Sequence, residues 1–366
     1  MRICFLCVEI FAWGKYGGFG RATRMIGREL ARRGVEVCAI VPRRMDQKPV
    51  EELDGIRIYG FDLKNIPQAL KLYQEVDADI YHSEEPSTST YLAMKMMPDR
   101  KHMITFRDVR MWDDWKIEFQ LPSISRMQVI KNWLYEDNPA VWQAVHHADG
   151  LFAASNVVGE RAVKKYHLAD PVPLLPTPVN VPETIQKAGT PWVCFVARLD
   201  RRKRPELFFK LAERFPQVHF ISMGTSRDPG LEKELEARYS SIPNLEIGGF
   251  IDQFSGGKHS EVLEKSWILV NTAAREGLPN SFVEAAAHRC AILSAVDPDN
   301  FASEYGYFVQ NDDFDAGLTW LLENNHWQEC GKKGHAYIQN TYEVESAISR
   351  HLKLYEELLR SPARSR

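Results

Sequence analysis

The stretch WVCFVARLDRRKRPELFFKLAERF, residues 192–215, contains the repeating unit from which the fold is predicted. Its first six residues are an unbroken apolar run, which is typical of a strand buried on both faces of a sheet. A polar loop follows, and Pro205 suits the first turn of the helix that we expect up to residue 215. A strand, a loop and a helix in this order indicate a parallel α/β sheet.

The same alternation recurs along most of the chain. Strands are expected at residues 3–10, 35–41, 56–60, 80–82, 102–106, 150–154, 218–223, 245–248, 267–271 and 291–295, and helices at 20–33, 230–240, 259–265, 281–289 and 344–359. Prolines are dense between residues 171 and 191, where neither a helix nor a central strand is compatible with them. The sequence therefore predicts two doubly wound domains, residues 1–178 and 190–343, with the helix at about 344–360 packing back on the first.

Composition excludes several classes of protein. The chain has 366 residues, of which 44% are hydrophobic and 26% charged, as in an ordinary globular protein. A formal net charge of -3 gives no general attraction to nucleic acid, so no nucleic-acid partner is expected. Six scattered cysteines in mostly apolar surroundings, with no signal pattern and no long apolar stretch, predict a reduced, cytoplasmic protein. Cys4 and Cys7 lie inside a predicted strand with no second pair, which disfavours a metal or redox site.

The most specific candidate site residues follow two predicted strands of the second domain. Glu276 lies in the loop that opens the helix at 281–289, and Glu284 lies in that helix, so both are expected at the carboxyl edge of the sheet. Two carboxylates there can bind the hydroxyls of a sugar-like ligand, although the pair alone fits solvated surface charges better. Arg198 and Lys203 follow a second strand and supply cations suited to a nucleotide diphosphate.

With these motifs the sequence resembles the retaining nucleotide-sugar glycosyltransferases of family 4, which have the GT-B fold. The resemblance rests on Glu276-x7-Glu284, on Arg198-Leu199 followed by Lys203, and on the N-terminal Gly17-Gly18 loop. It implies transfer of a sugar from a nucleoside-diphosphate sugar to a glycan, lipid-linked or small-molecule acceptor, with retention of anomeric configuration. No cofactor and no metal are expected, since Asp77-Ala78-Asp79, which has the spacing of a metal motif, precedes its strand.

The resemblance also implies roles for individual residues. Arg198 and Lys203 would neutralise the departing diphosphate, and Glu276 would contact the transferred sugar, which makes these three the expected catalytic residues. Glu284 would bind the ribose hydroxyls. The other donor-binding positions implied by the resemblance are Gly17, Gly18, Gly224, Phe250, Ile251, Asp252, Gly277 and Leu278. Arg107 is added to them because its guanidinium can anchor a phosphate.

Two segments depart from the family pattern. Thr105-Phe106-Arg107-Asp108 stands where the family usually has Thr-x-His-Asp. A guanidinium stays protonated and cannot act as a general base, but it can anchor a phosphate or an anionic acceptor group. A retaining mechanism tolerates this change, because the leaving diphosphate can take the acceptor's proton. The second departure is His288-Arg289-Cys290, where Gly-x-Pro is common.

The acceptor side and the location of the protein leave alternatives open. The acceptor-binding candidates are Asp108, Trp112, Asp114 and Trp115, in a segment interpreted as a loop; their composition suits sugar binding and fits plain packing of the domain edge equally well. Arginines recur on one face of the first helix, at positions 21, 24, 28 and 32. This face fits a solvated surface or a peripheral contact with anionic lipid at the inner membrane face.

Other functions fit the same sequence features less closely. A sugar-nucleotide epimerase of the same fold, or a non-catalytic sugar-nucleotide-binding scaffold, would share the nucleotide site. The presence of all four residues expected at the donor site favours the transferase over these alternatives; they are Arg198, Lys203, Glu276 and Glu284. The donor base and sugar are left open.

Overall fold

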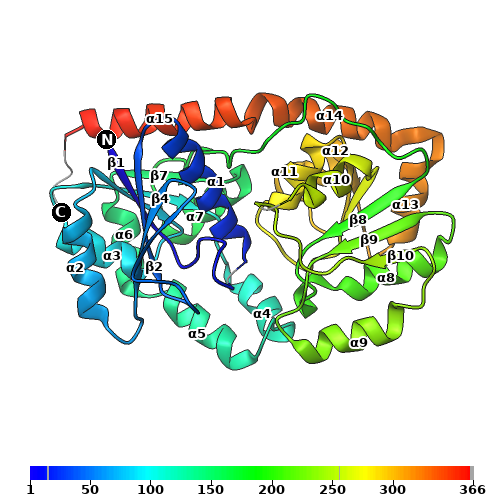
Figure 1. Cartoon of the computed structure of the whole chain (residues 1–366), viewed down its shortest axis with the longest axis horizontal. Helices are drawn as coiled ribbons and strands as arrows, with labels where there is room; N and C mark the ends of the chain where they lie inside the picture. The colour runs from blue at the N-terminus through cyan, green and yellow to red at the C-terminus, as the bar shows by residue number, and fades with distance from the viewer. Residues whose placement is uncertain (15, 255, 363–366) are drawn as a thin grey trace. The chain divides into compact units, whose positions relative to one another are not determined.

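The computed structural model describes residues 1–14, 16–254 and 256–362, which divide into two compact units (Figure 1). Unit 1 comprises Met1–Met111, Lys131–Pro178 and Val344–Arg366, and unit 2 comprises Trp112–Ile130 and Val179–Glu343. Each unit contains its own sheet with helices around it. The segment Trp112–Ile130, expected within the first domain, belongs instead to unit 2, because its buried charges pair with arginines of that unit, as described below.

Unit 1 contains a seven-stranded sheet in the order β3-β4-β2-β1-β5-β6-β7. Its strands are β1 (Arg2–Leu6), β2 (Glu36–Pro42), β3 (Val50–Leu53), β4 (Ile56–Phe61), β5 (Ile80–Glu84), β6 (Lys101–Phe106) and β7 (Gly150–Ala153). All neighbours are parallel except β3 and β4, which form a hairpin absent from the sequence prediction. Asp54 and Gly55 join them with φ angles of 52° and 80°, the positive values that a tight hairpin turn requires.

The helices of unit 1 cover the sheet and bring the end of the chain back to it. They are α1 (Gly18–Arg32), α2 (Ile66–Val76), α3 (Thr88–Met96), α6 (Pro139–His147), α7 (Asn156–Tyr166) and α15 (Val344–Arg360), while α5 (Arg126–Glu136) spans the division between the units. Ile348, Tyr355 and Leu358 of α15 are buried in the same core cluster as residues of β1 and β2, and α15 contacts α1. The apolar face of this helix therefore docks on unit 1.

Unit 2 contains a six-stranded, entirely parallel sheet in the order β10-β9-β8-β11-β12-β13. Its strands are β8 (Trp192–Val196), β9 (His219–Met223), β10 (Leu245–Ile247), β11 (Ile268–Asn271), β12 (Ala291–Ser294) and β13 (Gly306–Phe308). Its helices are α4 (Trp112–Gln120), α8 (Pro205–Arg214), α9 (Pro229–Tyr239), α10 (Lys258–Lys265), α11 (Asn280–Ala287), α12 (Phe301–Tyr305), α13 (Phe314–Leu322) and α14 (His326–Thr341). Two core clusters contain alternate residues of the strands, which explains their unbroken apolar sequence.

Strand order reverses once in each sheet, at β8 in unit 2 and at β1 in unit 1. Several of the loops that carry predicted site residues follow strands at these reversals. The first strand of unit 2, β8, lies between β9 and β11, and in unit 1 β1 lies between β2 and β5. Loops that follow the two strands at a reversal leave the sheet in opposite directions, so ligands of α/β proteins bind there. The α/β fold with two doubly wound domains is thus confirmed.

The proline-dense stretch is extended, as expected. Residues 167–191, all of them described, form no helix or named strand, and their only regular pairings are the isolated bridges Ala153↔Leu174 and Val179↔Glu343.

A buried polar chain joins α15 to the sheet of unit 1. The imidazole of His82 lies between two hydroxyls, with Nδ1 2.8 Å from Tyr355 and Nε2 2.7 Å from Thr105. His351 Nε2 lies 3.2 Å from the carbonyl of Pro176. Burial lowers the pKa of His82 well below its ordinary value and that of His351 to about 3. Both imidazoles are therefore neutral in the folded protein.

These neutral histidines predict that stability falls as the pH falls below about 6.5. The unfolded chain binds protons at His351 with an ordinary pKa, whereas the folded chain excludes them until about pH 3, so the free energy of unfolding decreases by up to about 1.4 kcal/mol per pH unit per histidine in this window. Urea unfolding at pH 7.5, 6.5 and 5.5 measures the decrease. His351→Gln should reduce it, and His147→Gln, on an exposed residue, should not. An unchanged slope in His351→Gln would contradict the prediction.

Candidate active site

The loop after β8 holds Arg198 at the carboxyl edge of the sheet. Leu199, 1% exposed, anchors the loop in the core, and the carboxylate of the buried Asp200 lies 3.2 Å from Nη2 of Arg198. The Arg198 side chain remains 27% exposed. Asp200 therefore orients a cation that still reaches solvent. Asp200 was not among the predicted site residues, although its position between Leu199 and a run of basic residues indicated that it could pair with one of them.

Gly224 fixes the approach of the neighbouring loops. It has a φ of +145°, and a Cβ at this position would lie 1.9 Å from the carbonyl oxygen of Ala197. Its N–H donates to the carbonyl of Gly249 at 2.8 Å, and the N–H of Leu199 donates to the carbonyl of Thr225 at 3.1 Å. Only glycine permits this contact, which joins the loops that follow β8, β9 and β10. The predicted nucleotide-pocket residue thus lies directly against the backbone that leads into Arg198.

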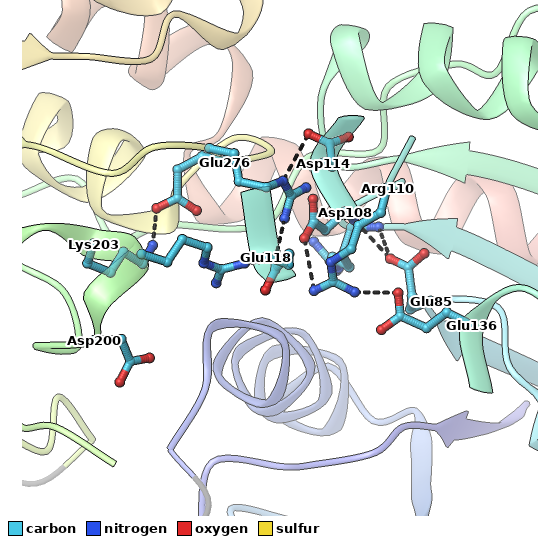
Figure 2. A network of polar contacts seen from close by, with 12 residues as sticks. Glu85, Asp108, Arg110, Asp114, Glu118, Glu136, Asp200, Lys203 and Glu276 are labelled. Atoms are coloured by element: carbon cyan, nitrogen blue, oxygen red, sulfur yellow. Dashed lines mark hydrogen bonds and ion pairs between the residues drawn. The ribbon is translucent and has the colours of Figure 1, made fainter. Parts of the chain in front are cut away.

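Lys203 and Glu276, predicted from two different strand ends, meet in the structure (Figure 2). The Lys203 ammonium donates a hydrogen bond to Oε1 of Glu276, and each side chain is 13% exposed. Burial lowers the pKa of Lys203, and the Glu276 carboxylate opposes that shift. The amide of Ala274 also donates to the carbonyl of Arg202 at 3.0 Å. The loops after β8 and β11 are therefore bonded through both side chains and backbone.

The helix after this loop carries the second predicted glutamate. Glu284 lies in α11, and its Oε2 is 3.6 Å from Nε2 of His259 on α10. Gly277 is buried, and Leu278 packs against the core. His259 was missed from the sequence because only the fold brings α10 beside α11.

His288, one of the departures from the family pattern, joins the same two helices. Its Nδ1 lies 2.8 Å from the carbonyl of Glu284, and its Nε2 lies 2.8 Å from the hydroxyl of Ser260 on α10. Burial lowers the pKa of His288 to about 4. A neutral imidazole that donates from Nδ1 and accepts at Nε2 satisfies both contacts, which gives this substitution a structural role.

The predicted base-contacting residues follow β10. Phe250 is 44% exposed, while Ile251 packs against the core. Asp252 accepts a 2.9 Å hydrogen bond from the amide of Phe254. Phe250 thus presents part of its side chain to solvent, and Asp252 shapes its own loop.

In unit 1 the glycine loop already contacts an anion. Gly17 precedes α1, and a Cβ on Gly17 would lie 1.9 Å from Oε1 of Glu9. The same oxygen accepts a hydrogen bond from the amide of Gly20 at 3.3 Å. A carboxylate therefore lies where the start of a helix favours negative charge. The absence of a side chain at Gly17 leaves room for this carboxylate.

Arg107 is enclosed by partners in unit 1. Its guanidinium forms a buried ion pair with Glu84 and donates to the hydroxyl of Thr177. Glu85 accepts hydrogen bonds from the amides of Arg107 at 2.6 Å and Asp108 at 2.9 Å. Burial raises the pKa of Glu85 to about 7. Any contact of Arg107 with a donor phosphate would have to compete with Glu84.

The interpretation of residues 112–119 as a loop was wrong, because they form helix α4. Acidic residues in its first turn favour the helix. Trp112 is 63% exposed, but Trp115 and Asp114 are buried. Asp114 accepts a 3.0 Å hydrogen bond from Nε of Arg275 within unit 2. Of the three acceptor-binding candidates on this helix, Trp112 alone presents most of its side chain to solvent.

Three of the four arginines that recur on one face of α1 are paired with acids. Nε of Arg24 lies 2.7 Å from Asp54, and Arg28 and Arg32 lie 3.2 and 2.9 Å from Glu29. These partners reduce the positive charge that the spacing indicates. Among the helices of the described chain, none has the length and apolar character needed to cross a bilayer.

All six cysteines are free thiols. Within the described ranges, no cluster of three or more histidine, cysteine, aspartate or glutamate side chains is arranged to hold a metal ion.

Comparison with solved structures shows what this fold is similar to. Sucrose-phosphate synthase from Thermosynechococcus elongatus is 17% identical with a TM-score of 0.74, and 98% of each chain is covered. HepE from Anabaena, solved in complex with UDP-glucose, is 14% identical with a TM-score of 0.74, covering 98% of this chain and 100% of that one. The catalytic domain of starch synthase IV from Arabidopsis thaliana, bound to ADP and acarbose, is 12% identical with a TM-score of 0.65, covering 98% and 99%. These similarities confirm the GT-B fold.

Family models match both halves of the chain. Residues 16–182 match the model described as Glycosyltransferase Family 4, and residues 190–324 match the model described as Glycosyl transferases group 1. No curated protein matches significantly. Since the two matches together span most of the sequence, the chain belongs to the glycosyltransferases, with a family 4 domain in its first half and a group 1 domain in its second.

Proposed function

We propose that this glycosyltransferase moves a sugar from a nucleoside-diphosphate sugar to a sugar-containing, lipid-linked or small-molecule acceptor, with retention of anomeric configuration and without a metal. The observation that carries the proposal is the meeting of two loops at the strand reversal of unit 2. That meeting places Lys203 against Glu276, with Arg198 in the same loop as Lys203 and Glu284 on the helix that follows Glu276.

The cations account for departure of the diphosphate. Transfer breaks the bond between the anomeric carbon and the diphosphate oxygen, and negative charge grows on that oxygen. Arg198 can bind it with two parallel hydrogen bonds, and Lys203 adds a mostly buried charge whose attraction is strengthened by the low local dielectric. These two side chains would supply the stabilisation that a metal ion supplies in other transferases.

The pair between Lys203 and Glu276 suggests how donor binding prepares the site. A bound diphosphate would replace Glu276 as the partner of Lys203. The released carboxylate would then accept hydrogen bonds from the hydroxyls of the transferred sugar, and Glu284 would bind the ribose. The acceptor's proton would pass to the departing diphosphate, because Arg107 cannot accept it.

The first prediction concerns the nucleotide. Structural neighbours were solved with UDP-glucose and with ADP, so the base of the donor has to be measured. We expect one of UDP, GDP or ADP, at about 100 times its dissociation constant, to add about 2.7 kcal/mol of stability and raise the melting temperature by roughly 3–4 °C in a thermal-shift assay.

The matched variants are Arg198→Ala, which should abolish the shift, and Arg201→Ala, which should keep it, because Arg201 is 53% exposed and lies near Asp228. Absence of a shift with every nucleotide would point to a scaffold or another function. An equal loss of the thermal shift in both variants would show that it depends on the overall positive charge of the loop and not on Arg198.

The second prediction concerns stereochemistry. With the α-linked form of the sugar nucleotide that gives the shift, the product observed by proton NMR at early times should also be α-linked. A β-linked first product would exclude retention, and release of an altered free sugar nucleotide would indicate an epimerase.

The third prediction concerns metals. Because Arg198 and Lys203 are expected to neutralise the diphosphate, transfer should proceed within about twofold of its initial rate after dialysis against EDTA. A loss of tenfold or more that magnesium restores would show that a metal shares this work.

A further inference from the structure

Helix α4 carries two buried carboxylates that face the loops of the proposed donor site. Asp114 and Glu118 lie one turn apart on the same face of α4. Glu118 Oε1 accepts hydrogen bonds from Nη1 of Arg202 and, at 3.1 Å, from Nη1 of Arg275. Asp114 Oδ1 accepts from Nε of Arg275 at 3.0 Å. All four side chains are at most 10% exposed, so these contacts are shielded from solvent.

The two arginines directly precede the two residues that meet in the site. Arg202 is followed by Lys203, and Arg275 is followed by Glu276. One carboxylate, that of Glu118, therefore contacts both loops one residue before the Lys203–Glu276 pair. Figure 2 shows Asp114 and Glu118 on α4 together with the pair formed by Lys203 and Glu276. Displacement of either arginine would shift the backbone that carries its neighbour.

The negative charge of Glu118 also matters for the cations next to the site. Burial is the main cause of the lowered pKa of Lys203, and Arg202 lowers it further, because two cations side by side repel each other. Glu118 pairs with Arg202, so the cation that repels Lys203 has a buried carboxylate partner. Buried ion clusters add little net stability compared with apolar packing of the same volume, so thermodynamic stability alone does not explain four buried charges here.

We propose that Glu118, assisted by Asp114, is a positioning residue for the glycosyl transfer: it fixes Arg202 and Arg275 so that Lys203 and Glu276 keep their mutual position. The inference rests on the proposed function for its catalytic consequence, while the positioning itself can be tested without any ligand. Residues that position reactive groups affect turnover more than ground-state binding, because small displacements raise the barrier steeply.

The ligand-free test is hydrogen–deuterium exchange of Glu118→Gln, which preserves the volume of the side chain, with Glu118→Ala as a second variant. Asp113→Asn is the matched control, because Asp113 lies on the same helix with its side chain 87% exposed. We expect exchange at least fivefold faster in peptides covering residues 198–205 and 272–280 in both Glu118 variants, and no change in the control. Changes confined to α4, or spread evenly over unit 2, would overturn the proposal.

The kinetic test uses the sugar nucleotide that stabilises the wild-type protein. Glu118→Gln should lower kcat about 10–100-fold and change the donor KM less than threefold, whereas Asp113→Asn should leave both unchanged. Because Glu118 acts through Arg202, adding Arg202→Gln to Glu118→Gln should cause little further loss. Full additivity, or an effect on KM alone, would contradict the inference. If no nucleotide binds, the proposed function fails, and the exchange measurement still decides the positioning role.

Discussion

The hydrogen bond between Lys203 and Glu276 depends on the order of strands in unit 2. The two residues are 73 positions apart, and they meet because β8 and β11 are neighbours in the sheet. If the strands lay in the sheet in the order of the sequence, β8 and β11 would not be neighbours, and the two loops would lie apart. Gly224 imposes a further constraint, since any side chain there would collide with the carbonyl of Ala197 and move the start of the Arg198 loop. The geometry of the site is therefore a consequence of topology and of one close backbone contact.

Two of the charged groups proposed to act on a donor already have internal partners. Lys203 contacts Glu276, and Arg107 contacts Glu84. A buried charge left without a partner is costly, so these pairs let the folded chain retain reactive groups in the absence of a ligand. If a diphosphate binds as proposed, it would replace the carboxylate as the partner of Lys203. The net gain in free energy would then be the difference between a diphosphate and a carboxylate as partners of the same cation.

Much of the fold could be predicted because its signals are local. Unbroken apolar runs mark the buried parallel strands, and Glu276 and Arg198 follow such runs directly. The hairpin at Asp54 and Gly55 also had a local signal, an Asp-Gly pair, although apolar runs alone do not reveal it. The place of helix α4 in unit 2 could not be assigned this way, since Glu118 contacts Arg202 and Arg275 at separations of 84 and 157 residues. A sequence shows that an acid is present; only the folded chain shows which cation it meets.

Arg107, which stands where the family usually has histidine, provides no base for the proposed transfer. A guanidinium cannot take up a proton, and Arg107 is buried against Glu84 and Thr177, so its described contacts are those of a structural ion pair. Glu85, next to it, has a pKa of about 7, but its carboxylate is occupied by the amides of Arg107 and Asp108. If transfer proceeds as proposed, the acceptor's proton must leave with the diphosphate. The barrier then depends mainly on how strongly Arg198 and Lys203 stabilise that leaving group, and hence on every contact that holds their loop in place.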